Sequence, residues 1–186
     1  MTGGRNDDDD VQTKSEIILP GGQSCSFLKD IPSPGRQDHT LSGYTVCGGR
    51  QSFGNLQESI ENTCHSFKAG KWELTHNLAE SRFLHVSWNS PSGVILMGPG
   101  YTTEKLSNTS NTTEPSFNLV NKGWIACAIE LEDTVVVTGG DWPSVPIVQV
   151  YNINGHQEQL PNMTRPRSFH ACGHYVDSNN KVVSAR

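Results

Sequence analysis

The chain has 186 residues and a net charge of −5, with 14 lysines and arginines against 19 aspartates and glutamates. The basic residues form no patch, so a nucleic-acid surface is not expected, and no apolar run approaches the roughly 20 residues of a membrane-spanning helix. The 18 glycines and 10 prolines are spread along the chain, which favours many short strands joined by turns and hence an all-β fold.

A glycine pair, or a variant of one, recurs at the end of an apolar run. The runs are MTGG, YTVCGG, GVILMGPG and VVVTGG, and their first glycines are Gly3, Gly48, Gly98 and Gly139. Gly48 with Gly49 and Gly139 with Gly140 are adjacent pairs, as expected where a tight turn needs a positive φ, whereas Gly98-Pro99-Gly100 departs from the pattern. Spacings near 45 residues predict a repeat fold.

A second landmark, Arg-x-x-His, lies between successive glycine pairs. It comprises Arg36 and His39, Arg82 and His85, and Arg167 and His170. At the remaining expected place stands Lys122-Gly123-Trp124-Ile125, which keeps a basic residue but lacks the histidine. Catalysis needs one site, whereas this pair recurs, so we expect it to satisfy buried backbone carbonyls where repeats meet.

Each repeat is predicted to hold four strands. A hairpin leads from the landmark to the glycine pair, a polar loop and a third strand follow, and a fourth strand reaches the next landmark. Third strands are expected at 15–19, 62–67, 115–120 and 148–153. The repeats are 1–36, 37–82, 83–122, 123–167 and a partial 168–186, and the third is expected to lack most of its fourth strand. Four short antiparallel strands per repeat describe a propeller blade.

The chain resembles the kelch-repeat β-propeller family over nearly its whole length. The resemblance lies in the apolar runs before the glycines, in Phe67 and Tyr151 on third strands, in Trp72 on a fourth strand, and in the junction LPNMTRPRSFH. It implies a kelch-type propeller of about four blades whose loops bind a protein or a glycan. Both ends fall at nearly the same point of a repeat, so the terminal strands either join into one composite blade or leave the ring incomplete. Since kelch propellers usually have six or seven blades, we expect a fragment with an incomplete ring.

The segment FHACGHY would place His170, Cys172 and His174 on one face of a strand, a ligand set suited to zinc or copper. Because Cys127 falls at the equivalent place in the preceding repeat between isoleucines, we interpret both cysteines as small core residues and expect no metal or cofactor. Cys25 and Cys64 lie on outer strands of consecutive repeats. A disulfide between them in an oxidising compartment stays open at this point.

The loops after the glycine pairs, at 5–10, 51–58, 101–114 and 141–145, differ most in length and chemistry and are expected to carry specificity. The loop 105–115 contains N-glycosylation sequons at Asn108 and Asn111, and a further sequon begins at Asn162. The acidic run 7–10 is not assigned a role. The sequons and the cysteines favour a secreted or extracellular protein.

These observations predict a non-catalytic binding or scaffold module with a protein or glycan partner. One alternative is a substrate-recognition fragment of an intracellular kelch ubiquitin-ligase adaptor, although nothing resembles the helical dimerisation domain of those proteins. Another is a copper radical oxidase on the same fold, for which Tyr175 beside Cys172 and His174 is the nearest approach to the required cysteine–tyrosine crosslink. No phosphate loop, Gly-x-Ser-x-Gly elbow or His-Glu-x-x-His site is present, so an enzyme is not expected.

Overall fold

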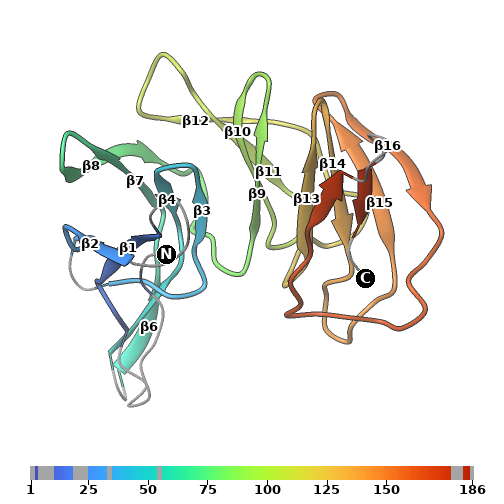
Figure 1. Cartoon of the computed structure of the whole chain (residues 1–186), viewed down its shortest axis with the longest axis horizontal. Coiled ribbons are helices and arrows are strands. Elements are labelled where there is room, and N and C mark those ends of the chain that lie inside the picture. Colours follow the sequence, from blue (N-terminus) through green and yellow to red (C-terminus); the bar gives the residue numbers. More distant parts are fainter. Residues whose placement is uncertain are drawn as a thin grey trace. The chain divides into compact units, whose positions relative to one another are not determined.

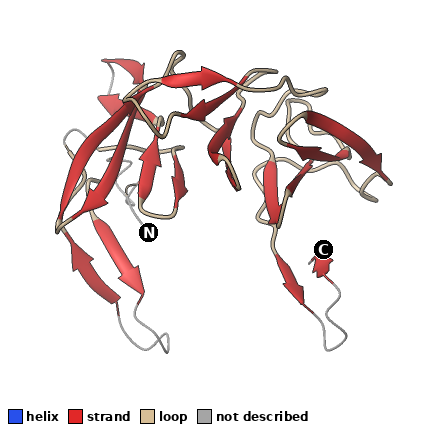
Figure 2. Cartoon of the chain, turned by 90° about the horizontal axis from the view of Figure 1, so that it is seen from above, coloured by secondary structure: helices blue, strands red, loops and turns tan. Residues whose placement is uncertain are grey.

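The computed structural model describes residues 3, 11–18, 25–32, 35–53, 56–176 and 182–184. These residues form strands and loops and contain no helix, so the prediction of an all-β fold is confirmed (Figures 1 and 2). None of them lies in a helix that could cross a membrane. The chain divides into an N-terminal body, residues 1–84 with 106–113, and a C-terminal body, residues 85–105 with 114–186.

The N-terminal body contains one four-stranded antiparallel sheet and two hairpins. The sheet has the order β3-β4-β7-β8, formed by Thr40–Ser42, Thr45–Cys47, Thr63–Lys68 and Lys71–Asn77. One hairpin pairs β1 (Ser15–Ile18) with β2 (Cys25–Leu28). The other pairs β5 (Arg50–Phe53) with β6 (Leu56–Ile60) and is inserted between β4 and β7, where the sequence predicted only a loop (Figure 1).

The remaining strands lie in or extend from the C-terminal body. One sheet has the order β12-β11-β10-β9, with β9 Val86–Ser90, β10 Gly93–Met97, β11 Thr103–Leu106 and β12 Thr113–Pro115. The next is β13-β14-β15-β16, with β13 Cys127–Leu131, β14 Thr134–Thr138, β15 Val148–Asn152 and β16 Gly155–Leu160. Finally, β17 (His174–Val176) pairs with β18 (Val182–Ser184). Each four-stranded sheet corresponds to one predicted repeat, and the composite terminal blade stays a prediction.

Three of the four expected third strands are present as β1, β7 and β15, but the one expected at 115–120 is wrong. The third strand of that repeat is β11 and its fourth is β12, so the repeat does not lack a fourth strand. Two apolar residues of 116–120 serve the core instead, since Leu119 is buried and Phe117 stacks on Tyr151 at 5.5 Å between ring centroids. The polar sequence of β11, TEKL, concealed the true strand.

The glycine pairs fit between the landmarks of two successive repeats. Gly139 has φ 62°, and a methyl group there would collide with the carbonyl oxygen of Arg167, the landmark residue at the boundary to the next repeat. Gly140 has φ 92°, and its methyl would lie 2.7 Å from the carbonyl oxygen of Trp124 in its own repeat. The glycines are therefore required both by their backbone angles and by the close approach of neighbouring backbone.

The same contacts correct the alignment of the landmark that lacks histidine. Gly3 faces Arg36 and Gly139 faces Arg167, but Gly98 faces Gly123. Gly123 rather than Lys122 thus stands at the arginine position, and Ala126 stands at the histidine position. A positive φ at the third landmark residue, namely Asp38, Leu84, Ile125 and Phe169 at 55°, 53°, 58° and 50°, supports this register.

The core of the C-terminal body is apolar and is built from alternate strand residues together with Leu119, which follows β12. Its members are Trp88, Ile95, Met97, Leu119, Val135, Val137 and Tyr151. The Tyr151 hydroxyl donates to Gln149 Oε1 at 2.6 Å and accepts from the backbone N–H of Val120 at 3.1 Å. This tyrosine therefore ties the segment after β12 to β15, as expected for a third-strand aromatic with a polar group at its tip.

We expect Gly139→Ala to lower the free energy of unfolding by about 2–3 kcal/mol, because it combines a left-handed backbone with the collision at Arg167. Gly43→Ala is the matched control. Gly43 has a similar φ of 56°, but a methyl there meets nothing within 4 Å, so its cost is about 1 kcal/mol. Urea unfolding measures both, and equal losses would contradict the role of the inter-repeat contact.

Candidate functional site

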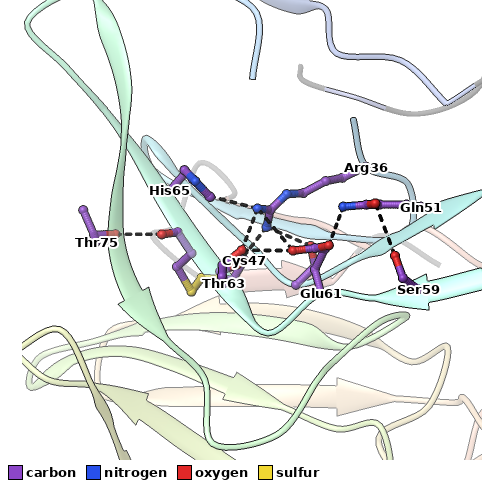
Figure 3. A network of polar contacts seen from close by, with 10 residues as sticks. Arg36, Cys47, Gln51, Ser59, Glu61, Thr63, His65 and Thr75 are labelled. Carbon is purple, nitrogen blue, oxygen red and sulfur yellow. Dashed lines mark hydrogen bonds and ion pairs between the residues drawn. A yellow bond between two sulfur atoms is a disulfide. The ribbon is translucent and has the colours of Figure 1, made fainter. Parts of the chain in front are cut away.

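Arg36 clamps the two ends of the inserted β5–β6 hairpin (Figure 3). One guanidinium nitrogen, Nη1, donates to the carbonyl oxygens of Gly48 at 3.2 Å and Thr63 at 2.7 Å. Gly48 precedes the hairpin and Thr63 follows it. Arg36 is only 4% exposed. The planar, always charged guanidinium suits this task because it offers several donors in a fixed arrangement.

The second guanidinium nitrogen meets a polar cluster at the base of the hairpin. Nη2 donates to Thr63 Oγ1 at 2.7 Å and to His65 Nδ1 at 2.9 Å, and it lies 3.8 Å from Glu61 Oε2. Since arginine has no acceptor, His65 Nδ1 must carry the lone pair. Burial, followed by the charge of Arg36, lowers the pKa of His65 to about 4. The cluster therefore holds a neutral histidine beside an ion pair.

Hydrogen bonds extend this cluster into both strands of the hairpin. Gln51 on β5 donates through Nε2 to Glu61 Oε1, and the Ser59 hydroxyl on β6 donates to Gln51 Oε1 at 3.2 Å (Figure 3). At the start of β5, Arg50 Nε donates to Asp38 Oδ2 at 2.5 Å. Its guanidinium also lies 5.6 Å from the centre of the Phe83 ring. The hairpin base is thus fixed on both strands.

Acidification should destabilise the fold through His65. Its pKa of about 4 in the folded chain lies below the usual 6.5, so between these pH values the unfolded chain binds a proton that the folded chain does not. Stability should fall as the pH drops from 6.5 to 4 and level off below. Because the ring is partly solvated, we expect about 1–2 kcal/mol. Urea unfolding across this range should show a smaller pH dependence for His65→Gln than for the wild type.

A disulfide between Cys47 and Cys64 brackets the same hairpin. The two residues are direct cross-strand partners on β4 and β7, with Cα atoms 4.1 Å apart, and they are 17 residues apart in sequence. The suggested Cys25–Cys64 pair is therefore wrong, and Cys25 is free and exposed. The strand register explains the pairing. The residue before a glycine pair lies opposite the beginning of the third strand, as Thr138 lies opposite Val148 in a later repeat. The positions of Cys47 and Cys64 in the repeat therefore already indicated that they are cross-strand neighbours.

A second disulfide joins Cys127 to Cys172, with Cα atoms 6.0 Å apart. The interpretation of both cysteines as unpaired core residues at equivalent positions is therefore wrong. Cys127 directly follows Ala126, whereas Cys172 lies two positions after His170. Because successive side chains in extended chain point to opposite faces, this offset of one position lets the two sulfurs face each other from successive repeats.

The landmark residues do not share one environment. Arg82 and His85 are buried at 2% and 5% exposure, but Arg167 is exposed. His170 Nε2 lies 2.9 Å from Thr138 Oγ1, and burial, with a smaller effect of Arg167, lowers its pKa. The His39 side chain packs against Gly3 and Gly49, since a methyl group on either glycine would lie within 3 Å of it. The arginines therefore divide into two buried side chains and one that is available at the surface.

The structure removes one member of the metal-ligand set considered from the sequence. The Cys172 sulfur is bonded to Cys127 and is not a thiolate ligand, while the side chain of His174 lies outside the described residues. Within the described part of the chain, no group of three or more His, Cys, Asp or Glu side chains is placed to hold a metal ion.

The three glycosylation candidates lie on exposed residues. Asn108 and Asn111 occupy the turn between β11 and β12, rather than the loop after a glycine pair, and Asn162 follows β16. The carbonyl oxygen of Asn111 accepts from the Asn77 N–H at 2.8 Å, and Thr113 Oγ1 accepts from the Ala79 N–H at 3.2 Å. These bonds fix the backbone while leaving the asparagine side chains at the surface.

We expect glycans on this turn when the chain passes through a glycosylating secretory pathway with a supplied signal peptide. Enzymatic deglycosylation should increase its mobility on a denaturing gel, and Asn108→Gln with Asn111→Gln should remove part of that shift. Asn162→Gln reports on the separate third site. If deglycosylation leaves the mobility of the wild type unchanged, the three sequons are chance matches.

The four loops predicted to carry specificity differ in the structure that they adopt. Residues 5–10, with the acidic run, lie outside the described residues, and 51–58 falls largely within the β5–β6 hairpin. The segment 101–114 contains β11 and the sequon turn. Only 141–145 is a simple loop, and it carries Trp142, which is 71% exposed.

Comparisons with known proteins agree with this architecture. No family model matches the sequence, and no curated protein matches it. Among solved structures, the chain is similar to one titled "Structure of YjhT", with a TM-score of 0.74 and 12% identity over 90% of this chain and 67% of that chain. YjhT is a kelch-repeat propeller protein, so the predicted kelch-type propeller fold is confirmed.

Proposed function

We propose that this kelch-type propeller chain is a non-catalytic binding module of an oxidising compartment. Its glycine-pair loops, including the β5–β6 hairpin, hold a protein or glycan partner. The observation that carries the proposal is the double fastening of that hairpin by Arg36 and by the Cys47–Cys64 disulfide. A loop that a rigid scaffold already holds loses less conformational freedom on binding.

The two disulfides support a location outside the cytosol. Disulfides persist in oxidising compartments and are rare where glutathione keeps thiols reduced. This chemistry favours a secreted, extracellular or periplasmic module over the intracellular ubiquitin-ligase adaptor. The exposed sequons support the secreted version of this proposal.

The arrangement of Cys172 argues against the copper oxidase alternative. Its sulfur is engaged with Cys127, so it is not available for the thioether to tyrosine that such an oxidase requires. The remaining histidines of the landmarks recur with the repeat and contact neighbouring backbone or hydroxyl groups. A binding role uses the loops that differ between repeats and leaves the recurring residues to the scaffold.

The proposal is tested by screening the chain against an array of extracellular proteins and an array of glycans. Replacing 52–58 by Asn-Gly shortens the hairpin while keeping Gln51, Ser59 and Glu61 at its base. We expect a partner whose affinity falls at least tenfold for this variant or for a variant in loop 141–145, with the unfolding midpoint unchanged. Absence of any binder, or a binder indifferent to both loops, would contradict the proposed site.

A further inference from the structure

Hydrogen bonds hold two segments of the C-terminal body side by side, so that they form one continuous surface. They are the loop 141–145 and the segment 165–169 at the junction with the next repeat. The backbone N–H of Arg167 donates to the carbonyl oxygen of Val145 at 3.3 Å, and the hydroxyls of Ser144 and Ser168 lie 2.7 Å apart. The N–H of Gly140 donates to the carbonyl oxygen of Arg167 at 2.8 Å. Side chains of both segments are therefore displayed together.

Two large aromatic rings stand out from this surface. Trp142 is 71% exposed and Phe169 is 68% exposed, although side chains of this kind are usually mostly buried. Their backbones are held, since the Trp142 N–H donates to Asp141 Oδ1 at 2.8 Å and the Phe169 N–H donates to the carbonyl oxygen of Ile125 at 3.2 Å. Exposed aromatic side chains on a fixed backbone are typical of binding hot spots.

Phe169 differs from the equivalent residues of the other repeats in its exposure and not in its backbone. Its φ of 50° is unfavourable for a bulky residue, and the same angle recurs at the equivalent residues Asp38, Leu84 and Ile125. Ile125 is buried and Asp38 pairs with Arg50, whereas Phe169 alone of the four is exposed. The scaffold thus imposes the angle, and here it points an aromatic ring into solvent.

Charge and hydrogen bonding indicate the chemistry of the partner. Arg165 and Arg167 are exposed, and Asp141 is the one acidic residue of 141–145 and 165–169, so the two segments carry a net positive charge on a chain whose net charge is −5. Ser144 and Ser168 bond each other, and Asp141 Oδ1 accepts from the Trp142 N–H, so part of the hydrogen-bonding capacity of these groups is used within the surface. An acidic protein segment matches these groups better than a sugar does.

We propose that the surface formed by Trp142, Arg165, Arg167 and Phe169 binds an acidic protein segment that presents an apolar side chain. The two rings cover the apolar side chain, and the two arginines pair with flanking carboxylates. The proposal rests on the binding function proposed above and specifies the partner of one of its loops.

The test uses the whole chain and a phage-displayed library of random twelve-residue peptides as the probe. Selection should enrich peptides with two or more Asp or Glu residues beside a leucine or an aromatic residue. Binding of a selected peptide should fall at least tenfold for Trp142→Ala and for Arg167→Glu, and should weaken with salt. Tyr44→Ala is the control, because Tyr44 is 63% exposed in the N-terminal body and its loss should leave binding unchanged.

Fluorescence supplies a second readout on the folded protein. Trp142 is the most exposed tryptophan and Trp88 is fully buried, so a bound peptide should shield Trp142 from iodide quenching, an effect that Trp142→Phe abolishes. Enriched peptides that bind Trp142→Ala and Arg167→Glu normally would overturn this inference and leave the general binding function standing. Neutral or basic peptides, or glycans that bind through Trp142, would overturn the choice of an acidic peptide. No enrichment above background would overturn this inference, while the general binding function is judged by the protein and glycan arrays.

Discussion

Replacing Cys127 and Cys172 together by alanine is expected to lower the free energy of unfolding by about 4 kcal/mol. The disulfide closes a loop of 45 residues, and the entropy that such a crosslink removes from the unfolded chain corresponds to about this value. The bond joins β13 to the segment before β17, and so joins one repeat to the next. Loss of this disulfide should therefore loosen the junction between the two repeats as well as lower the free energy of unfolding.

Urea unfolding of oxidised and reduced protein measures this effect. Reduction should weaken the wild type more than the double variant, which retains only the Cys47–Cys64 bond. That bond closes a loop of 17 residues and is expected to contribute about 3 kcal/mol. Cys25→Ala is the control, since this thiol is free and exposed and its loss should change stability by less than about 0.5 kcal/mol. Equal midpoints for the oxidised wild type and the double variant would contradict the pairing.

The fold was predictable because its signals are local and repeated. Each glycine pair demands a positive φ next to a neighbouring backbone, and this steric requirement leaves a mark at every repeat. The strands with branched or aromatic residues, such as β14 and β15, were visible for the same reason. By contrast, β11 has the polar sequence TEKL, and its burial depends on contacts that no local pattern reports.

The candidate site was less predictable because it depends on register. An error of one residue at Lys122 made Cys127 and Cys172 look equivalent, which concealed a disulfide that requires them to be offset. The β5–β6 hairpin is an insertion found in one repeat, so periodicity gave no reason to expect strands there. The Arg-x-x-His motif identified the recurring arginines, but the sequence could not distinguish the buried Arg36 from the exposed Arg167.

That difference between equivalent arginines underlies the second large effect. Arg36→Met should lower the free energy of unfolding by about 3–5 kcal/mol, because it removes donors from the Gly48 and Thr63 carbonyls and leaves Glu61 without its nearby positive charge. Arg167→Met, at the same landmark position, should cost less than about 0.5 kcal/mol because that side chain is exposed. Urea unfolding compares the two variants directly.

Arg36→Lys separates charge from geometry. A lysine ammonium keeps the positive charge near Glu61, but it lacks the planar fork that reaches two carbonyls, Thr63 Oγ1 and His65 at once. We expect it to recover less than half of the stability lost in Arg36→Met. Hydrogen exchange of the hairpin amides should rise in both variants before that of β7 and β8, since the clamp acts on the hairpin ends. Full recovery by lysine would show that charge alone explains the effect.

The His65 titration gives an independent measure of the same clamp. Burial is the larger cause of its low pKa and the charge of Arg36 the smaller one, so Arg36→Met should raise the His65 pKa above about 4 without restoring 6.5. Arg36→Lys should leave it close to the wild-type value, since the charge remains. The ring protons of His65, followed by NMR against pH, report this directly. An unchanged pKa in Arg36→Met would mean that Arg36 does not lie beside His65 in solution, and the clamp on the hairpin would lose its basis.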